Sequence, residues 1–281
     1  MQEEKVPKVS VCVITYNQGA FISKAVNSAL IQKTNFEYDI IIADDCSTDD
    51  TTQILTELRD RYPNKIKLLL RNKNVGAAKN WIELIRYPRS KYIAYLEGDD
   101  YWSDTEKLQK QHDALEINSN VSLCFHDVIL RNAVDNSQSI FPKTKKNMFY
   151  TADVILRPWF CPSGSIMFRS EIVSSIPDDI ISVHNGDLAL LYFCSIHGPL
   201  LRIDDCMGVY NYLAPNSQSL KLRGADDRRK KLINMSSTIG YIRKNASIKY
   251  YLYIYIKLTS IKLKAMISFV IFFIHKIRKT F

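Results

Sequence analysis

The chain has 281 residues, of which 46% are hydrophobic and 24% are charged. This balance is typical of folded soluble domains and excludes a disordered, collagen-like or low-complexity chain. The net charge of +9 is unevenly distributed, because 13 of the 38 Lys and Arg residues follow Asp227 and no Asp or Glu does, which leaves residues 1–227 with a charge of −4.

The first hundred residues alternate short apolar strands with amphipathic helices. Residues 9–14 form a nearly continuous apolar run that predicts a buried strand, and residues 21–30 have apolar side chains at the spacing of a helix. The alternation predicts βαβ units and a doubly wound, mostly parallel sheet of the Rossmann-like α/β class. The pattern continues with a strand at 38–43, a helix at 50–62, a strand at 66–70, a helix at 77–87 and a strand at 91–96.

The second half of the chain is less regular and predicts a mixture of helices and strands. It ends in a helical stretch at 226–246 and a separate apolar and basic segment at 248–281. Between residues 104 and 213 we expect a helix at 104–117, a strand at 121–126, a polar excursion near 131–147, a strand at 164–169, a helix at 187–196 and strands at 200–204 and 206–213.

The spacing of the cysteines and the first residues of the chain both indicate the cellular compartment. The six cysteines are spaced singly, without a C-x-x-C pair, which argues against a zinc ribbon and a small disulfide scaffold. Reduced thiols are typical of cytoplasmic proteins. The first residues are charged and lead into no apolar segment, so we expect no secretory signal and a cytoplasmic protein.

Acidic residues follow two of the predicted strands at the point where each strand ends. Asp44 and Asp45 end the second strand, and Glu97, Asp99 and Asp100 end the fourth. Ligands of open parallel sheets bind outside the carboxyl ends of the strands, and carboxylates that the fold brings together are relieved by a divalent cation. The sequence therefore favours a metal and diphosphate site. The alternative is that these residues serve only as turn and helix-cap residues.

Four ordered blocks within these hundred residues resemble family 2 glycosyltransferases of the GT-A fold, and a weaker likeness continues into the second half. The likeness covers residues 7–220. The four blocks are residues 9–17 (VSVCVITYN), 44–49 (DDCSTD), Asn74, Val75 and Gly76 with Asn80, and 97–102 (EGDDYW), and the weaker ones are 185–188 (NGDL), 196–200 (IHGPL) and Tyr210.

The resemblance implies a domain organisation and a nucleotide site. The glycosyltransferase domain would occupy residues 1–220, with a nucleotide-binding half at 7–103 and an acceptor half at 104–220, and residues 221–281 would form a basic amphipathic helical tail. Asp45, with Asp44 close behind, would hydrogen-bond the nucleotide base in a pocket lined by Thr15 and Tyr16. The full set implied for nucleotide binding is Thr15, Tyr16, Asn17, Asp44, Asp45, Asn74, Gly76 and Asp99.

The resemblance also implies the metal ligands and the base. Asp100 would bind Mg²⁺ or Mn²⁺ that bridges the diphosphate, and Asp99 would bind the ribose or the metal. Asp187 falls at the position of the family's catalytic base, which takes a proton from the acceptor hydroxyl during an inverting displacement. Asp187 could alternatively cap the helix that follows.

Two further residues are candidates for the acceptor side. Trp102 follows the second acid block and could stack on an acceptor sugar, although a buried aromatic beside a turn fits its position equally well. His184 could contact a phosphate group, and the alternative for a single loop histidine is a solvated surface position.

The tail from residue 248 interleaves lysines with aromatic and aliphatic residues. Its longest uncharged run, residues 265–274, has ten residues, and a helix needs about 20 to span a bilayer. We expect the tail to lie on an anionic membrane surface. A C-terminal helix packed on the domain is the alternative, and a nucleic-acid-binding tail would be more basic and less apolar.

Together these features predict a metal-dependent inverting glycosyltransferase that moves a sugar from a nucleotide-diphosphate sugar to a glycan. We expect the acceptor to be lipid-linked, the enzyme to be peripheral on the cytoplasmic face of the inner (plasma) membrane, and nucleic acid not to be a partner. The alternatives are a nucleotidyltransferase acting on sugar phosphates and a non-catalytic module that binds sugar nucleotides or glycans.

Overall fold

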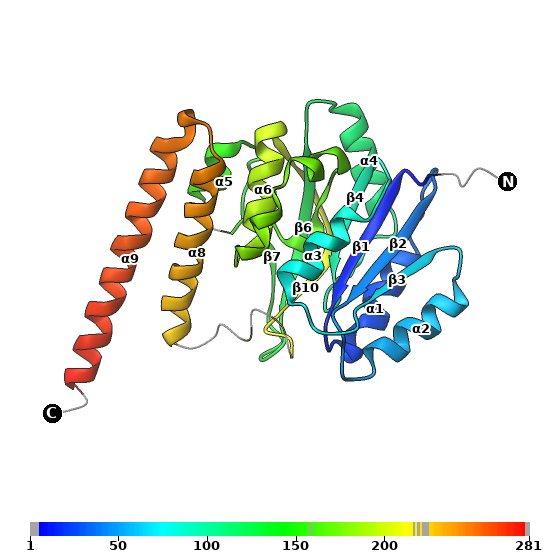
Figure 1. Ribbon diagram of the computed structural model, residues 1–281, viewed down its shortest axis with the longest axis horizontal. Helices are drawn as coiled ribbons and strands as arrows, with labels where there is room; N and C mark the ends of the chain where they lie inside the picture. The colour runs from blue at the N-terminus through cyan, green and yellow to red at the C-terminus, as the bar shows by residue number, and fades with distance from the viewer. Residues whose placement is uncertain (1–5, 158, 216, 218–219, 221–224, 279–281) are drawn as a thin grey trace.

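A computed structural model describes the backbone of residues 6–157, 159–215, 217, 220 and 225–278, and the side chains of the same residues except 225–229 and 267–278. The chain folds around one large sheet (Figure 1). Its strand order is β3-β2-β1-β4-β9-β6-β10-β5, with β7 paired to β6 and β8 paired to β10. It is mostly parallel at its N-terminal side and mixed beyond β4.

The N-terminal half forms the doubly wound unit that the sequence predicts. Strands β3, β2, β1 and β4 are adjacent and parallel, so their carboxyl ends lie along one edge of the sheet. Every boundary lies within one or two residues of its prediction. The elements are β1 (Val9–Thr15), α1 (Gly19–Leu30), β2 (Tyr38–Asp44), α2 (Thr51–Arg61), β3 (Ile66–Leu70), α3 (Ala77–Arg86) and β4 (Tyr92–Glu97).

The second half adds antiparallel strands and the helices α4, α5 and α6. Short 3-10 segments at 163–165, 170–175, 178–182 and 248–250 connect some of them. The main elements are β5 (Tyr101–Trp102), α4 (Lys107–Ile117), β6 (Leu123–Asn132), β7 (Gln138–Phe141), β8 (Met148–Phe149), α5 (Thr151–Leu156), β9 (Met167–Arg169), α6 (Gly186–His197), β10 (Leu200–Tyr212), α8 (Ala225–Asn245) and α9 (Tyr251–Arg278).

Three predictions for this half were wrong in detail. The two strands expected at 200–204 and 206–213 are one strand, β10, which shifts register against β6 on both sides of Cys206. The polar excursion near 131–147 contains the end of β6 and its antiparallel partner β7. The strand expected at 164–169 is shorter, because residues 163–165 form a 3-10 turn before β9.

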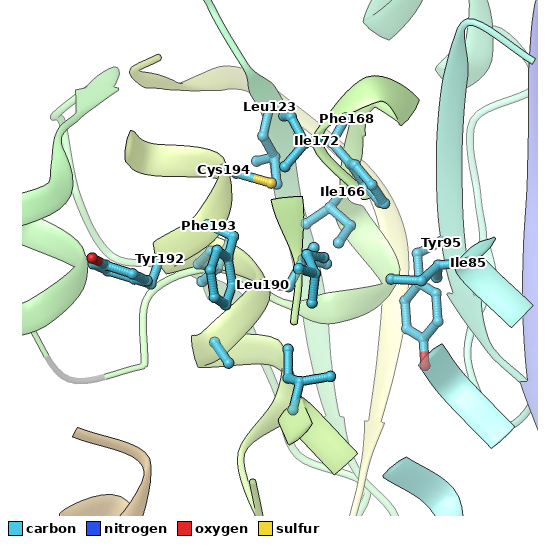
Figure 2. Close-up of a cluster of buried hydrophobic side chains, with 14 of the residues drawn as sticks. Ile85, Tyr95, Leu123, Ile166, Phe168, Ile172, Leu190, Tyr192, Phe193 and Cys194 are labelled. Carbon is cyan, nitrogen blue, oxygen red and sulfur yellow. The ribbon is translucent and has the colours of Figure 1, made fainter. Parts of the chain in front are cut away.

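Two hydrophobic cores cover the two faces of the sheet, because successive side chains of β1 point to opposite faces. Val11 and Val13 pack with Ile22 and Val26 of α1. Cys12 and Ile14 belong to the other core, which α3 and α6 cover. Figure 2 shows part of this second core, in which Leu190 of α6 lies between Phe193 on one side and Tyr95 and Ile85 on the other.

The C-terminal helices pack on the domain in the part that the structure describes. α8 and α9 lie at the end of the molecule opposite the N-terminus (Figure 1). Ile239 and Ile242 of α8 and Ile254 and Ile261 of α9 are buried in the second core. The alternative of a packed C-terminal helix therefore holds for α8 and for one side of α9. Within the described part of the chain, no helix combines the length and the apolar character required to cross a membrane.

Candidate active site

A cavity of about 370 Å³ opens at the carboxyl ends of β1 and β4, and we call it the nucleotide-side cavity. This edge is the usual ligand position of open α/β sheets. Six of the eight residues that the resemblance assigns to nucleotide binding line it, namely Thr15, Tyr16, Asp45, Asn74, Gly76 and Asp99. The remaining lining residues are Ile14, Gln18, Ala77, Asn80, Glu97, Ser163, Tyr210 and Ser217.

Asp45 holds the loop that precedes α3. Its two carboxylate oxygens accept hydrogen bonds from the backbone N–H groups of Val75, at 2.7 Å, and Gly76, at 3.0 Å. Gly76 has a φ of 87°, a conformation that glycine adopts without steric penalty. Two blocks that are thirty residues apart in the sequence therefore meet on one wall of the cavity.

The other two residues of that set, Asn17 and Asp44, do not line the cavity. The Asn17 side-chain oxygen accepts a hydrogen bond from the Thr48 N–H at 2.7 Å, and the Asn17 N–H donates to the Ser47 hydroxyl at 2.9 Å. Asp44 is buried and accepts hydrogen bonds from Ser47 and from Thr52. Asn17 ties the loop after β1 to the loop after β2, and Asp44 ties the latter loop to α2, so both residues position the cavity wall without lining it.

Gly98 allows the ends of β1 and β4 to approach each other. Its N–H donates to the Ile14 carbonyl at 2.9 Å. A Cβ atom at this position would lie 2.3 Å from Gln18 Oε1 and 2.9 Å from Thr15 Oγ1, distances that require those side chains to move. The lack of space for a Cβ atom thus explains why a glycine stands between Glu97 and Asp99, which the sequence alone did not reveal.

The three acids after β4 point to different places. Glu97 and Asp99 line the nucleotide-side cavity. Asp100 is buried in a separate hole of about 10 Å³, where its Oδ1 accepts a hydrogen bond from the Asn211 N–H at 2.8 Å. Of this pair, Asp99 lines the cavity and Asp100 does not, and the expected role of Asp100 as a metal ligand stays a prediction.

Burial and mutual repulsion raise the pKa values of these carboxyl groups. The pKa of Glu97 is raised to about 8, mainly by burial and next by the charge of Asp99. The pKa of Asp99 is raised to about 6 by burial. Burial and then the charge of Asp99 also raise the pKa of Asp100 well above its usual value.

This acidic set fits a divalent cation shared with a ligand. Among the described residues, no three His, Cys, Asp or Glu side chains are grouped closely enough to form a complete metal site. Mg²⁺ and Mn²⁺ are commonly held by one or two carboxylates together with phosphate oxygens of a substrate. Asp99 with Glu97 beside it supplies such a partial site, and a cation there would relieve the repulsion that raises the pKa values.

A second cavity of about 560 Å³ adjoins the first, and we call it the acceptor-side cavity. The two cavities share the side chains of Ile14, Ala77, Glu97, Ser163 and Tyr210, so they meet at the end of β4. Asp187 and His184 lie on the acceptor-side wall, together with Trp81, Tyr95, Leu190 of α6 and Asn234 of α8.

Asp187 is the second residue of α6, whose N-cap is Asn185, so the cap alternative for Asp187 does not hold. Its carboxylate accepts a hydrogen bond from the Leu188 N–H at 2.8 Å. The side chain is open to the cavity, yet protein atoms surround it and raise the pKa of its carboxyl above the usual range. A carboxylate with a raised pKa is a better proton acceptor than a free aspartate.

Trp102 is not available to a sugar. It is 4% exposed, its indole N–H donates to the Gly164 carbonyl at 2.8 Å, and the Lys107 Nζ lies 3.6 Å from the centroid of its ring. The prediction that Trp102 stacks on an acceptor was wrong, and the alternative of a buried aromatic holds. His184, in contrast, is exposed on the acceptor-side wall.

An aromatic cluster that the sequence did not suggest borders the cavities. Trp159 stacks on Phe141 with ring centroids 4.3 Å apart, and its ring lies 5.3 Å from that of Tyr210, which lines both cavities. Trp159 is 40% exposed. These residues come from β7, the segment after α5, and β10, so no local sequence pattern joins them.

Comparison with known proteins gives a family match. The family model named Glycosyl transferase family 2 matches residues 10–176, which is more than half of the chain. The uncharacterized protein Rv1520 of Mycobacterium tuberculosis (strain ATCC 25618 / H37Rv) is 32% identical over 203 residues, which make up 72% of this chain and 58% of Rv1520. This chain thus spans less than two thirds of the length of that relative.

Two further similarities concern a named enzyme and a solved structure. WfaP of Escherichia coli, a UDP-Glc:alpha-D-GlcNAc-diphosphoundecaprenol beta-1,3-glucosyltransferase, is 36% identical over 104 residues, or 37% of this chain and 40% of WfaP. The mannosyltransferase PcManGT of Pyrobaculum calidifontis, solved with GDP-Man and Mn²⁺, is 12% identical and has a TM-score of 0.58 over 94% of this chain and 85% of PcManGT. The structural likeness confirms the predicted α/β fold of the GT-A type.

Proposed function

Because the chain belongs to glycosyl transferase family 2, we propose that it transfers a sugar from a nucleotide-diphosphate sugar to a hydroxyl group of a glycan, with inversion at the anomeric carbon. The observation that carries the proposal is the pair of joined cavities. One is lined by Asp45 and Asp99, the other by Asp187, and both share Glu97. A donor that fills both would present its anomeric carbon at their junction.

The nucleotide-side cavity would hold the nucleoside diphosphate. Tyr16 is partly exposed on its wall and offers a ring to a base, while Asp45 offers a carboxylate beside it. The name of WfaP, a UDP-Glc-dependent enzyme, supports a uridine nucleotide.

A divalent cation would be held by Asp99, assisted by Glu97, with diphosphate oxygens as further ligands. When bound, such a cation supplies charge stabilisation to the departing nucleoside diphosphate. The Mn²⁺ with which PcManGT was solved supports this proposal.

Asp187 would act as the general base. It accepts the proton of the acceptor hydroxyl while the acceptor oxygen forms a bond to the anomeric carbon. The bond between that carbon and the diphosphate oxygen breaks on the opposite face, and the nucleoside diphosphate leaves with the electron pair. The positive end of α6 lies beside Asp187 and favours its ionised form before the reaction.

The acceptor would be a glycan, and we assign Trp159 and Tyr210 to its recognition because Tyr210 lines both cavities and the exposed ring of Trp159 lies beside it. Aromatic rings bind the apolar faces of sugar rings. The name of WfaP, whose acceptor is diphosphoundecaprenol-linked, supports a lipid-linked acceptor, which we place on the cytoplasmic leaflet of the membrane.

The testing experiment is a donor panel with Mn²⁺ or Mg²⁺, in which release of nucleoside diphosphate is followed. One donor should turn over, and Asp99→Asn should abolish metal-dependent turnover. Asp60→Asn is the matched control, because Asp60 is an exposed residue near the end of α2. Release of pyrophosphate from a nucleoside triphosphate and a sugar phosphate would instead identify a nucleotidyltransferase. A folded protein that binds donors but never turns them over would identify a binding module.

A further inference from the structure

Helix α9 has one side packed on the protein. Ile254 and Ile261 are buried in the second core, and the Lys257 Nζ donates hydrogen bonds to the carbonyl oxygens of Leu156 and Arg157 at the end of α5, at 3.0 and 2.9 Å. These contacts fix the rotation of the helix about its axis. The opposite side is consequently turned away from the domain.

That outward side carries five apolar residues and one polar residue, Thr259, although solvent-facing sides of surface helices are normally polar. Leu252, Tyr255, Ile256, Leu263 and Met266 are all exposed, Tyr255 by 70%, and we call them the outer stripe. Their spacing of three, one, seven and three residues places them along one side of a helix with 3.6 residues per turn. An exposed row of large apolar side chains of this kind, interrupted only by Thr259 in its described part, marks a binding site more often than a free surface.

The charge around the outer stripe selects its partner. Lys262 and Lys264 are exposed on either side of Leu263 in the sequence, and no Asp or Glu follows Asp227. A second copy of the chain would bring the same positive charges together at the stripe, which is unfavourable. An apolar stripe with lysines around it and no acid is complementary to lipid chains beneath anionic headgroups.

We infer that the outer stripe of α9 binds the surface of an anionic membrane. The side of α9 that packs on α5 and α8 stays in contact with the protein, so only the stripe enters the headgroup region. α8 lies beside α9 and contributes Asn234 to the acceptor-side cavity (Figure 1). The inference does not depend on catalysis, although a lipid-linked acceptor would then meet the enzyme on a shared surface, a consequence that relies on the proposed function.

The test is co-sedimentation of the full chain with vesicles of phosphatidylcholine, alone or with about a third of phosphatidylglycerol. We expect binding to the anionic vesicles and weaker binding to the neutral ones. About 0.5 M salt, which screens the lysines, should weaken binding to the anionic vesicles and leave binding to the neutral ones nearly unchanged. Leu252→Glu, Ile256→Glu and Leu263→Glu combined should lower the partition coefficient roughly tenfold or more, because three aliphatic side chains no longer enter the lipid.

The matched control combines Ile31→Glu, Ile117→Glu and Val134→Glu, three exposed apolar residues outside α9 that give the same change in net charge. The control should bind vesicles almost as the unaltered chain does. Equal losses in both triple variants, or an unaltered chain that stays in the supernatant with anionic vesicles, would overturn the inference. A dimer that the stripe variant converts to a monomer, without any vesicle binding, would also overturn it and identify the stripe as a contact between copies. Donor turnover, measured without membranes, reports separately on the proposed function.

Discussion

The hydroxyl group of Tyr95, on the acceptor-side wall, donates a hydrogen bond at 3.1 Å to Oε1 of Glu97, which lines both cavities. Ser163 donates to the same oxygen at 3.3 Å. Two hydroxyl groups therefore fix the Glu97 carboxyl in a buried position, next to Asp99 and within the electrostatic influence of Asp187. The carboxyl group that joins the donor and acceptor sides thus lies in an environment that strongly disfavours its charge.

The raised pKa of Glu97 predicts a pH-dependent stability. With a pKa of about 8 in the folded chain, Glu97 binds a proton that the unfolded chain releases near pH 4.5. The folded state therefore holds more protons between these values, and its stability falls as the pH rises from about 5 to 8. Glu97→Gln removes this loss, and the variant should gain on the order of 3 kcal/mol relative to the unaltered chain between pH 5 and pH 8. Urea unfolding at both pH values measures it, and a constant difference would contradict the altered pKa.

The proposed base predicts a selective loss of rate. Asp187→Asn keeps the size of the side chain but cannot accept the acceptor proton, so kcat should fall by about 10²–10⁴ while the affinity for the donor stays within about twofold. In the unaltered enzyme the rate should rise with pH through the raised pKa of Asp187. Rapid-mix kinetics and donor titration by calorimetry separate the two effects. Equal losses of donor affinity and rate would assign Asp187 to donor binding.

Gly98 provides a steric test of the nucleotide-side cavity. Gly98→Ala places a methyl group 2.3 Å from Gln18 Oε1 and 2.9 Å from Thr15 Oγ1, so it should cost about 1–3 kcal/mol of stability and weaken donor binding roughly tenfold. Gly240→Ala is the control. It lies in α8 with no atom within 4 Å of the added methyl group, and it should stabilise the chain by about 0.5–1 kcal/mol. Thermal unfolding and donor titration of both variants provide the comparison.

The sequence predicted the fold of the N-terminal half well, because each strand there is a short apolar run, and the acids follow two of these strands directly in the chain. Thr15, Asp45 and Asp99 consequently line the cavity that their strand ends form. The sequence could not show which way a side chain turns after the strand ends. Asp100 turns to the Asn211 N–H and Trp102 to the Gly164 carbonyl, and both partners lie more than sixty residues further along the chain.

Part of the site comes from the mixed half of the sheet. Ser163, which the sequence analysis missed, and Tyr210, which it named without a role, reach the wall because β9 and β10 return beside β4 and β6. The sequence predicted two strands in place of β10, because Asp204 and Asp205 interrupt the apolar pattern at the point where the register against β6 shifts.

The burial of Lys107, away from the two cavities, predicts that its replacement by an apolar residue stabilises the folded chain. Its Nζ is buried without a hydrogen-bond partner, and burial lowers its pKa well below the usual value. The unfolded chain binds this proton more readily, so Lys107 lowers the stability below about pH 10, and the loss grows as the pH falls. Lys107→Met keeps the length of the side chain and should raise the unfolding free energy by about 1 kcal/mol at neutral pH. The energy of the lost contact between Lys107 and the Trp102 ring reduces this gain. Urea unfolding measures this, and a less stable variant would show that the cation–π contact outweighs burial.

The position of Trp159 predicts that its substitution slows transfer to a glycan acceptor but not hydrolysis of the donor. The ring is exposed beside Tyr210 and contacts no acid of the nucleotide-side cavity in the described contacts, so Trp159→Ala should lower kcat/KM for a glycan acceptor about tenfold, the value of one lost aromatic contact. Hydrolysis of the donor by water should continue at its original rate. Tyr62→Ala is the control, because Tyr62 is about as exposed but lies at the end of α2.

The fluorescence of Trp159 offers a second measurement. Trp159 is the only exposed Trp of the three, since Trp81 and Trp102 are buried, so iodide quenching of the intrinsic fluorescence should fall when a glycan binds. If Trp159→Ala slows donor hydrolysis as much as transfer, the aromatic cluster supports the donor site and the acceptor must bind elsewhere on the acceptor-side wall.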